Sequence, residues 1–236
     1  MAHIPVLFEE TVKELNIVPD GTYVDMTIGG FGHGAAICKK LSENGMYVGF
    51  DLDEAAIERV KELASGFDCK VLFIHDNFHN FKERLTEIGI SSVNGVLADL
   101  GVSSFQIDEA ERGFSFMKDG PLDMRMDNSS GISAEDVVNT YSFEDLKRIL
   151  QIYGEEKFAH SIASSIVKHR AQKPLKTTFD LVECVKRGVP PKVLHNGKNP
   201  AAKTFQAVRI EVNGELEGLR ETLENAVDML KPKGRL

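Results

Sequence analysis

The chain has 236 residues, of which 42% are hydrophobic, and its 28 basic and 36 acidic side chains give a formal net charge of -8 at pH 7. This length and composition predict a globular protein with one core, or one core and a smaller inserted subdomain, and the acidic balance argues against a protein that coats nucleic acid without selectivity. Because no apolar run reaches the ~18 residues of a membrane span and residues 1–10 lack the layout of a signal peptide, we expect a cytoplasmic protein without membrane contact.

The first hundred residues alternate short β-rich runs with segments of helical period, which is typical of βαβ units around a parallel sheet. The expected strands are residues 22–27, 46–51, 70–75 and 95–99. Between the strands, apolar residues recur at helical spacing from Ala56 to Leu63 and from Phe78 to Ile88. The sequence therefore predicts an α/β fold with a Rossmann-like sheet and crossover helices on its faces.

The alternation of strand-like and helical patterns ends after Gln106. Residues 111–127, ERGFSFMKDGPLDMRMD, carry no sustained period and predict a long loop. Helical patterns then follow one another without strands, around residues 143–153, 158–166 and 181–185, which indicates an all-helical insertion. A last amphipathic helix is expected to use one apolar face, formed by Leu216, Leu219, Leu223, Val227 and Leu230. Residues 231–236 resemble the start of another strand.

A glycine-rich turn and a carboxylate suggest a nucleoside site. Asp25 ends the first expected strand and is followed by MTIGGFGHG, whose glycines permit positive φ and close approach of the backbone to a ligand. The second strand ends in VGFDLD, which puts Asp51 nineteen residues after Gly32. At that separation a carboxylate can accept hydrogen bonds from both ribose hydroxyls of an adenosine cofactor.

Of the two candidate cofactors, the pattern favours S-adenosylmethionine over NAD. The glycines do not follow GxGxxG, and Asp25 can face the methionine amino group, whereas it would repel a pyrophosphate. His33 can donate to a carboxylate or cap the helix that follows the turn. Phe78, at the end of the third strand, can lie against adenine or belong to the core.

We expect no metal site. His75 and His79 have an i, i+4 spacing but no acidic third ligand accompanies them. Cys38, Cys69 and Cys184 are scattered and suit neither a disulfide framework nor zinc, so we interpret them as small core residues.

The candidate catalytic residue, Asp99, lies at the end of the expected fourth strand, in the sequence ADLGVSSFQID. An amine whose lone pair is delocalised into a ring, such as that of cytosine, would be a poor nucleophile, and a carboxylate that accepts hydrogen bonds from its N–H groups would favour attack on a sulfonium methyl group. Asp99 can serve that role or instead hold the cofactor. Ser103 and Ser104 can contact the base or cap a helix, and Gln106 can bind cofactor or substrate or be an exposed surface amide.

The motifs together closely resemble the RsmH (MraW) family. They are HIPVLFEE, DMTIGGFGHG, DLGVSS, ERGFSFMKDGPLDMRMD, YGEEKFA and KTFQAVRIEVN, and they span residues 3–236. The resemblance implies a class I methyltransferase that uses S-adenosylmethionine to methylate N4 of a decoding-site cytidine in bacterial 16S rRNA. By motif match it implies cofactor contacts at Phe31, Gly32, His33, Asp51, Phe78, Asp99 and Gln106.

The resemblance also implies two domains. Residues 1–109 and 208–236 would form a discontinuous cofactor-binding domain, and the helical insertion, residues 110–207, would recognise the RNA within the small ribosomal subunit. Family members usually continue beyond Gly234–Leu236, so we expect the carboxyl-terminal strands to be missing and the fourth strand to lie at an edge of the sheet. The fourth-strand motif also lacks the aromatic residue of DPPY amino-methyltransferases, which leaves Phe105, Phe114 or Phe116 as candidates for stacking on the base.

Positive charge is concentrated late in the insertion. Residues 161–210 contain ten basic and two acidic side chains, 10 - 2 = +8, so the rest of the chain carries -16. Phosphate binding is one use of such a segment and a solvated helix face is the other. The expected RNA contacts are Arg112, Arg125, Arg170, Lys203 and Arg209. Two other functions stay open: an RNA-binding or assembly module without turnover, and an amino-methyltransferase with a different substrate. The oligomeric state is also left open.

Overall fold

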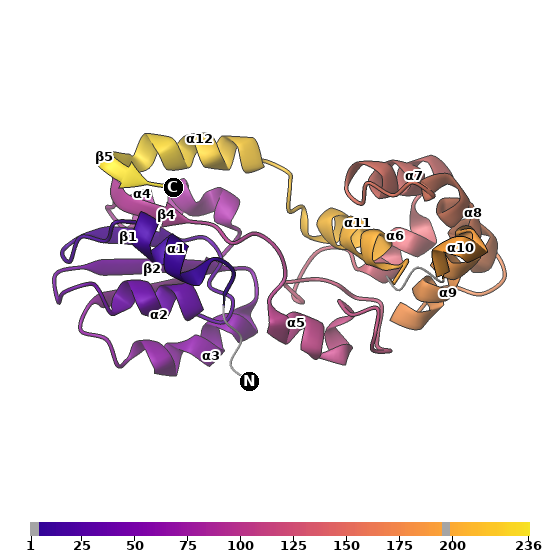
Figure 1. Ribbon diagram of the computed structural model, residues 1–236, viewed down its shortest axis with the longest axis horizontal. Helices are drawn as coiled ribbons and strands as arrows, with labels where there is room; N and C mark the ends of the chain where they lie inside the picture. The colour runs from indigo at the N-terminus through magenta and orange to yellow at the C-terminus, as the bar shows by residue number, and fades with distance from the viewer. Residues whose placement is uncertain (1–4, 195–198) are drawn as a thin grey trace. The chain divides into compact units, whose positions relative to one another are not determined.

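The computed structural model describes residues 5–194 and 199–236 (Figure 1). Within these ranges, every helix is too short or too polar to cross a lipid bilayer. The chain forms two compact units. Unit 1 comprises Met1–Ser103 and Glu217–Leu236, and unit 2 comprises Ser104–Leu216, which extends beyond the predicted insertion at both ends.

Unit 1 is built on a five-stranded parallel sheet with the spatial order β3-β2-β1-β4-β5. The strands are β1 (Thr22–Asp25), β2 (Met46–Asp51), β3 (Lys70–His75), β4 (Val93–Leu97) and β5 (Leu230–Arg235). The structure confirms the predicted α/β fold and the bounds predicted for β2 and β3. β1 and β4 each end two residues earlier than predicted.

The last strand corrects one expectation. β5 pairs in parallel with β4, with Val93 opposite Leu230 and Gly95 opposite Arg235. The prediction that the fifth strand is missing and that the fourth lies at an edge is therefore wrong, whereas the strand-like character noted for residues 231–236 is confirmed. The physical reason is that an exposed β4 would leave backbone N–H and C=O groups unpaired, and the segment after the last helix is long enough to pair with them.

Helices cover both faces of this sheet (Figure 1). They are α1 (Phe8–Glu14), α2 (Gly32–Cys38), α3 (Glu54–Ala64), the 3-10 helix η1 (Phe78–Asn80), α4 (Phe81–Glu87) and α12 (Leu219–Met229). Adjacent strand residues point to opposite faces, so Tyr47 joins the core cluster with α2 and α3, and Val48 joins the cluster with α4 and α12. All three cysteines are buried and free, which confirms their predicted place in the core.

The apolar face predicted for the last helix is wrong. α12 buries Thr222, Ala226 and Met229, whereas Leu223 and Val227 are 38% and 59% exposed. Both stripes lie within one broad apolar arc. The smaller side chains of Thr222 and Ala226 allow α12 to approach the sheet closely, so that stripe is the buried one.

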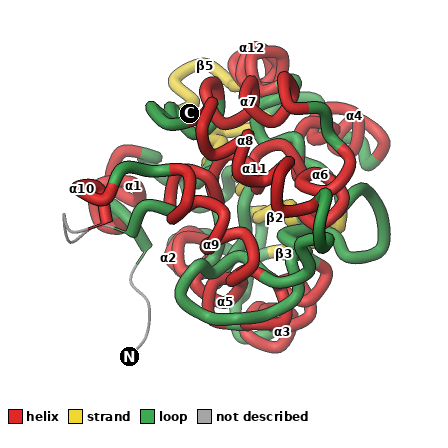
Figure 2. The backbone as a smooth tube through the Cα atoms, turned by 90° about the vertical axis from the view of Figure 1, so that its right-hand side faces the viewer, coloured by secondary structure: helices red, strands yellow, loops and turns green. Residues whose placement is uncertain are grey.

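Unit 2 consists of helices and loops in its described part, apart from one isolated bridge between Pro121 and Thr177 (Figure 2). The helices are α5 (Ser104–Asp108), the 3-10 helix η2 (Ala110–Arg112), α6 (Ala134–Thr140), α7 (Phe143–Ile152), α8 (Ala159–Arg170), α9 (Thr178–Gly188), α10 (Pro191–Leu194) and α11 (Ala202–Asn213). Capping boxes begin α6 at Ser133 and α9 at Thr177. This confirms the predicted all-helical character of the insertion.

The predicted long loop, residues 111–127, is held by its own hydrogen bonds. Arg112 lies buried and donates through Nη2 to the carbonyls of Arg125 and Met126 at 3.2 and 3.0 Å. Asn213, at the end of α11, accepts from the Met126 N–H at 2.7 Å and donates to the Met124 carbonyl at 2.8 Å. The 111–127 loop and the end of α11, which are far apart in the sequence, are therefore joined by hydrogen bonds.

Candidate active site

Three carboxylates gather at one edge of the sheet. Asp25 and Asp51 are the last residues of β1 and β2, and Asp99 follows β4 by two residues. Because the strands are parallel and in register, their carboxyl ends lie at the same edge. The charges of Asp51 and Asp99 both raise the pKa of Asp25, so the three groups interact electrostatically.

Asp25 is a buried carboxylate with internal partners. It is 1% exposed, accepts hydrogen bonds from the Tyr47 hydroxyl at 2.9 Å and from the Thr27 N–H at 3.0 Å, and has a pKa raised to about 7. Burial is the largest cause of the raised pKa, and these two hydrogen bonds oppose it. A cation near Asp25 would favour the ionised carboxylate.

Asp51 ties the glycine-rich turn to the end of β2. Its two oxygens accept hydrogen bonds from the Gly29 N–H and the Asp53 N–H, both at 2.9 Å. Burial raises its pKa, and these two bonds oppose the increase. Each carboxylate oxygen has two lone pairs, so Asp51 retains capacity to accept two further hydrogen bonds from a ligand.

Asp99 differs from these two carboxylates because it is exposed. Its backbone N–H donates to Oγ1 of Thr27 at 2.7 Å, which fixes the main chain at the end of β4 next to β1. Among the described residues, no hydrogen bond or ion pair to its carboxylate is found. Asp99 is therefore held in place by its backbone while its carboxylate faces solvent.

The turn between β1 and α2 is anchored in the core. Gly29 has φ +50°, and Phe31, which has φ 64°, precedes α2 with its ring buried. A Cβ at Gly34 would lie 2.5 Å from the Phe31 ring and 2.6 Å from the Tyr47 hydroxyl, so only glycine fits there. The ring of Phe31 is thus part of the core cluster with Tyr47.

His33 has an unused polar atom. Its ring is 7% exposed and stacks on Phe8, with the ring centroids 5.7 Å apart. Its Nε2 is buried and has no hydrogen-bond partner among the described residues. No side chain caps the start of α2, so the alternative in which His33 is the helix cap is not observed. An orphaned buried nitrogen beside a glycine-rich turn suits a polar ligand group.

Phe78 and Gln106 occupy different units. Phe78 lies in η1 and packs, partly buried, against the core cluster that contains Phe81. Gln106 lies in α5 of unit 2 and is 4% exposed, so the alternative of an exposed surface amide is wrong. Within unit 1, the structure brings Asp25, Asp51 and Asp99 to one sheet edge, next to the turn that leads into α2, and His33 lies in the first turn of that helix.

Each of the predicted RNA-binding residues forms hydrogen bonds with other residues of unit 2. Arg125 forms a bidentate ion pair with Asp123, with distances of 2.9 and 2.8 Å, and Arg209 forms one with Glu215, with distances of 2.7 and 2.9 Å. Arg112 holds the 111–127 loop, as described above. The other two contact the backbone: Arg170 donates to the carbonyls of Val138 and Tyr141 near the end of α6, and the exposed Lys203 donates to the carbonyl of Glu155.

The candidate stacking residues also differ from one another. Phe105 is 43% exposed, whereas Phe114 is buried with the Arg112 guanidinium 5.8 Å from its ring centroid. Phe116 makes an edge contact with Phe205 at 5.7 Å. Of the three, Phe105 alone presents a substantially exposed ring.

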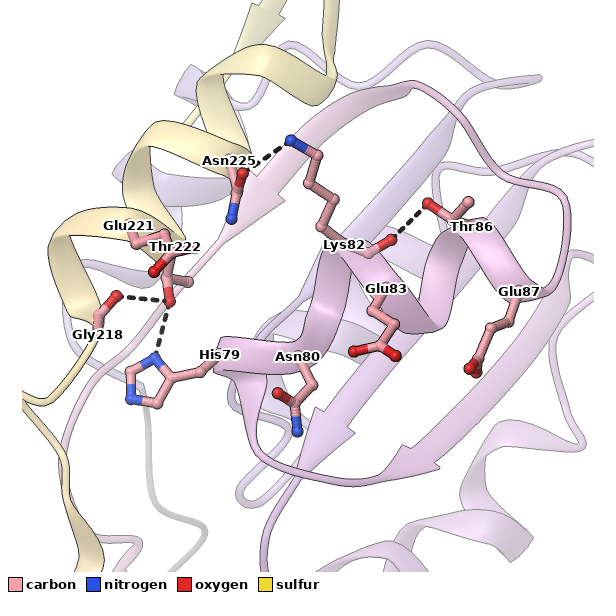
Figure 3. Close-up of a pocket in the computed structure, with 10 residues that line it drawn as sticks. All are labelled: His79, Asn80, Lys82, Glu83, Thr86, Glu87, Gly218, Glu221, Thr222 and Asn225. Atoms are coloured by element: carbon pink, nitrogen blue, oxygen red, sulfur yellow. Dashed lines mark hydrogen bonds between the residues drawn. The ribbon is translucent and has the colours of Figure 1, made fainter.

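A groove of about 740 Å³ lies elsewhere in unit 1, between α4 and α12 (Figure 3). Nδ1 of His79 is 2.8 Å from Oγ1 of Thr222, and Nζ of Lys82 donates to Asn225 at 2.8 Å. These bonds join η1 and α4 to α12. None of the predicted site residues lines the groove.

Two residues of the carboxylate edge were not predicted from the sequence. Tyr47, the second residue of β2, donates to Asp25, and Thr27 contacts both Asp25 and the backbone of Asp99. A signal was present for Tyr47, because a buried tyrosine hydroxyl needs a partner and its strand neighbours the one that ends at Asp25.

Comparison with known proteins gives a consistent result. The curated protein named ribosomal RNA small subunit methyltransferase H from Clostridioides difficile is 50% identical over 234 residues, which cover 99% of this chain and 75% of that protein. The protein of the same name from Clostridium botulinum (strain Kyoto) shows the same identity and coverage. The model of the MraW methylase family matches residues 1–236. This chain therefore belongs to the MraW methylase family.

Proposed function

We propose that this chain uses S-adenosylmethionine to methylate the N4 amine of a cytidine in the decoding region of 16S rRNA, within the small ribosomal subunit. The names of the two curated relatives support a small-subunit rRNA as the substrate. The observation that carries the proposal is the cluster of Asp25, Asp51 and Asp99 at one edge of a parallel sheet, beside a glycine-rich turn.

The residues of this edge fit the chemical groups of the cofactor. Asp51 accepts hydrogen bonds from the ribose hydroxyls through the lone pairs that Gly29 and Asp53 leave unused. The buried Nε2 of His33 gains a partner in the cofactor's polar groups. Asp25 faces the amino group of the methionine portion, whose positive charge favours the ionised carboxylate.

The remaining cofactor contacts rest on the family resemblance. Phe31 and Gly32 contribute their backbone, because the Phe31 ring is buried in the core. Phe78 and Gln106 are assigned to the cofactor by motif match. In this proposal residues 1–109 and 208–236 hold the cofactor, and residues 110–207 recognise the RNA.

Asp99 is the proposed catalytic residue. A bound S-adenosylmethionine supplies an electrophilic methyl group on a sulfonium centre. The cytosine amine is a weak nucleophile because its lone pair is delocalised into the ring. The exposed carboxylate of Asp99 accepts a hydrogen bond from an N–H of that amine. This hydrogen bond favours the geometry in which the nitrogen lone pair is available to attack the methyl group. Transfer of the methyl group would form a C–N bond and break the bond between that carbon and the sulfonium sulfur, which would leave as a neutral thioether. The amine nitrogen becomes cationic in that transfer, and Asp99 stabilises its charge and accepts its surplus proton, which passes to water.

The test is methyl transfer to small-subunit rRNA that lacks the modification, followed by mass spectrometry of the nucleosides. We expect N4-methylcytidine from the unaltered chain and a turnover lower by about a hundredfold in Asp99→Asn, the typical cost of losing one transition-state hydrogen bond. Asp68→Asn is the matched control, because Asp68 is an exposed carboxylate just before β3, at the opposite end of a strand.

One further readout completes this experiment. Calorimetry with S-adenosylmethionine separates the roles of Asp99: unchanged cofactor affinity assigns it to the chemistry, and a loss of affinity equal to the loss of rate assigns it to cofactor binding. The absence of methylated cytidine from the RNA with the unaltered chain would refute the proposed function.

A further inference from the structure

The arrangement of positive charge in unit 2 differs from the one its sequence suggested. The four predicted arginines, Arg112, Arg125, Arg170 and Arg209, hold carbonyls or carboxylates of the unit itself. Part of the hydrogen-bonding capacity of each guanidinium is therefore used within the unit. The exposed cations in the described part of residues 161–210 are instead mainly lysines. Lys168, Lys173, Lys176 and Lys186 lie on α8, on α9 and on the linker between these helices, whereas Lys192 and Lys203 lie on α10 and α11.

α8 and α9 form a helical hairpin, residues 159–188. Ser161, near the start of α8, donates to the carbonyl of Gly188, the last residue of α9, at 2.5 Å. The two helices are therefore antiparallel, and the end of α8 lies beside the start of α9. Arg187 reaches along this pair, with Nη1 3.5 Å from Nδ1 of His169.

Three lysines surround this end of the hairpin. Lys168 is in the last turn of α8, and Lys173 and Lys176 are in the linker; all three are exposed. Nζ of Lys173 lies 3.6 Å from Oδ1 of Asp180, which is the one ion pair found for the three in the described part of the chain. Lys186 by contrast pairs with Glu183 at 2.9 Å, so its charge is locally compensated.

An exposed aromatic ring lies among these charges. Phe179 is in the first turn of α9, three residues after Lys176, and is 43% exposed. Its backbone N–H donates to Oδ1 of Asp119 at 3.3 Å, which fixes the main chain that carries the ring. An exposed ring beside cationic side chains is the arrangement that binds unpaired nucleotides, because the lysines contact phosphates and the ring stacks on a base.

We propose that the α8–α9 hairpin binds a single-stranded segment of the substrate RNA, with Lys168, Lys173 and Lys176 on its phosphates and Phe179 stacked on an unpaired base. This inference rests on the proposed function and assigns the RNA contact to a surface other than the four arginines. RNA is favoured over an acidic protein surface because carboxylates would match the lysines and leave the exposed ring of Phe179 without a partner.

The experiment measures RNA affinity without S-adenosylmethionine, by fluorescence anisotropy of the full chain with an unmodified small-subunit rRNA fragment over a range of salt concentrations. In Lys173→Glu/Lys176→Glu we expect at least tenfold weaker binding and a salt slope smaller by about 1.4, since each contact with single-stranded nucleic acid contributes about 0.7. In Phe179→Ala we expect binding weaker by about five- to a hundredfold with an unchanged slope.

The matched control is Lys39→Glu/Lys40→Glu, which makes the same change in net charge at two exposed lysines of unit 1. Circular dichroism checks that each variant is folded. Equal weakening by the control pair, or unaltered affinity and slope in Lys173→Glu/Lys176→Glu, would overturn the proposal. Polyglutamate that competes as well as RNA, together with an unaffected Phe179→Ala, would identify an acidic partner and also overturn it. Because no methyl transfer enters this readout, a chain that binds RNA through the hairpin but methylates nothing contradicts the proposed function alone.

Discussion

The turn between β1 and α2 and the loop of residues 111–127 are both glycine-containing motifs that stand out in the sequence, yet the structure uses them in opposite ways. At the turn, the Asp51 carboxylate and Nε2 of His33 retain hydrogen-bonding capacity. At the loop, Nη2 of Arg112 and the side-chain amide of Asn213 bond to the loop backbone. A distinctive motif therefore marks a demanding backbone, and its polar side chains can serve either a ligand or the backbone itself.

The sharpest test of the carboxylate edge is the pH dependence of Asp25→Asn. The pKa of Asp25 is raised to about 7, chiefly by burial, so the folded state keeps a proton that the unfolded state loses near pH 4. The contribution of Asp25 to the free energy of unfolding is fully present below pH 4 and is lost as the pH rises through 7. Asparagine does not titrate, so the Asp25→Asn variant cannot show that loss. The difference in unfolding free energy between the two chains should change by about 1.4 kcal/mol per pH unit, about 4 kcal/mol in all.

Denaturant unfolding at several pH values between 4 and 8 measures this difference. Parallel stability curves for the two chains would mean that Asp25 carries no burial penalty.

Arg112→Ala tests whether the side chain of Arg112 supports the backbone of the 111–127 loop. If Arg112 is part of the scaffold, its removal costs about 3 kcal/mol of unfolding free energy, because two hydrogen bonds from a buried guanidinium are lost and a cavity is left. Lys118→Ala, at an exposed cation within the same loop, should change stability by less than about 0.5 kcal/mol. Little loss of stability in Arg112→Ala combined with a large loss of RNA affinity would instead make Arg112 a ligand residue.

Gly34→Ala tests the anchor of the turn. The added Cβ collides with the Phe31 ring and the Tyr47 hydroxyl, so we expect about 2 kcal/mol of destabilisation and weaker cofactor binding. Gly66→Ala is the control, since its Cβ would meet one carbonyl at 3.8 Å and nothing closer. Thermal unfolding with and without S-adenosylmethionine measures both effects, and equal behaviour of the two variants would contradict the close approach at Gly34.

Asp51→Asn gives the smallest expected effect. The amide keeps the size of the side chain but replaces one charged acceptor oxygen, so cofactor affinity should fall about tenfold, or about 1.4 kcal/mol. Calorimetric titration with S-adenosylmethionine measures it. A change in stability as large as the change in affinity would show that Asp51 chiefly supports the turn.

Much of the fold could be predicted because its signals are local. The bounds of β2 and β3 follow from short β-rich runs between turn residues, and the helices of unit 2 begin at residues such as Ser142 and Thr177 that cap them. The buried face of α12 could not be predicted, since hydrophobicity favoured Leu223 and Val227 while close packing favoured Ala226. Periodicity gives an apolar arc, and the neighbouring elements decide which part of it is buried.

The candidate site was predictable only in its charged residues. Asp25, Asp51 and Asp99 were found because they lie at or near strand ends, although the ends of β1 and β4 were each predicted two residues too late. The partners of Asp25 come from another strand and from the turn, and no local pattern reveals them. The arginines of unit 2 show the same limit, because a count of charges cannot say that the guanidinium of Arg170 lies on carbonyls at the end of α6.

The buried ring of Phe31 connects the backbone of the proposed cofactor site to the hydrophobic interior of unit 1. Its edge contacts with Tyr47, Phe67 and Phe73 hold a left-handed backbone that only a well-packed interior can maintain. Conservative substitutions among these aromatic residues, none of which needs to touch a ligand, should therefore alter the dissociation constant. Conversely, a saturating ligand should raise the melting temperature of unit 1 and protect its slowest-exchanging amides from deuterium.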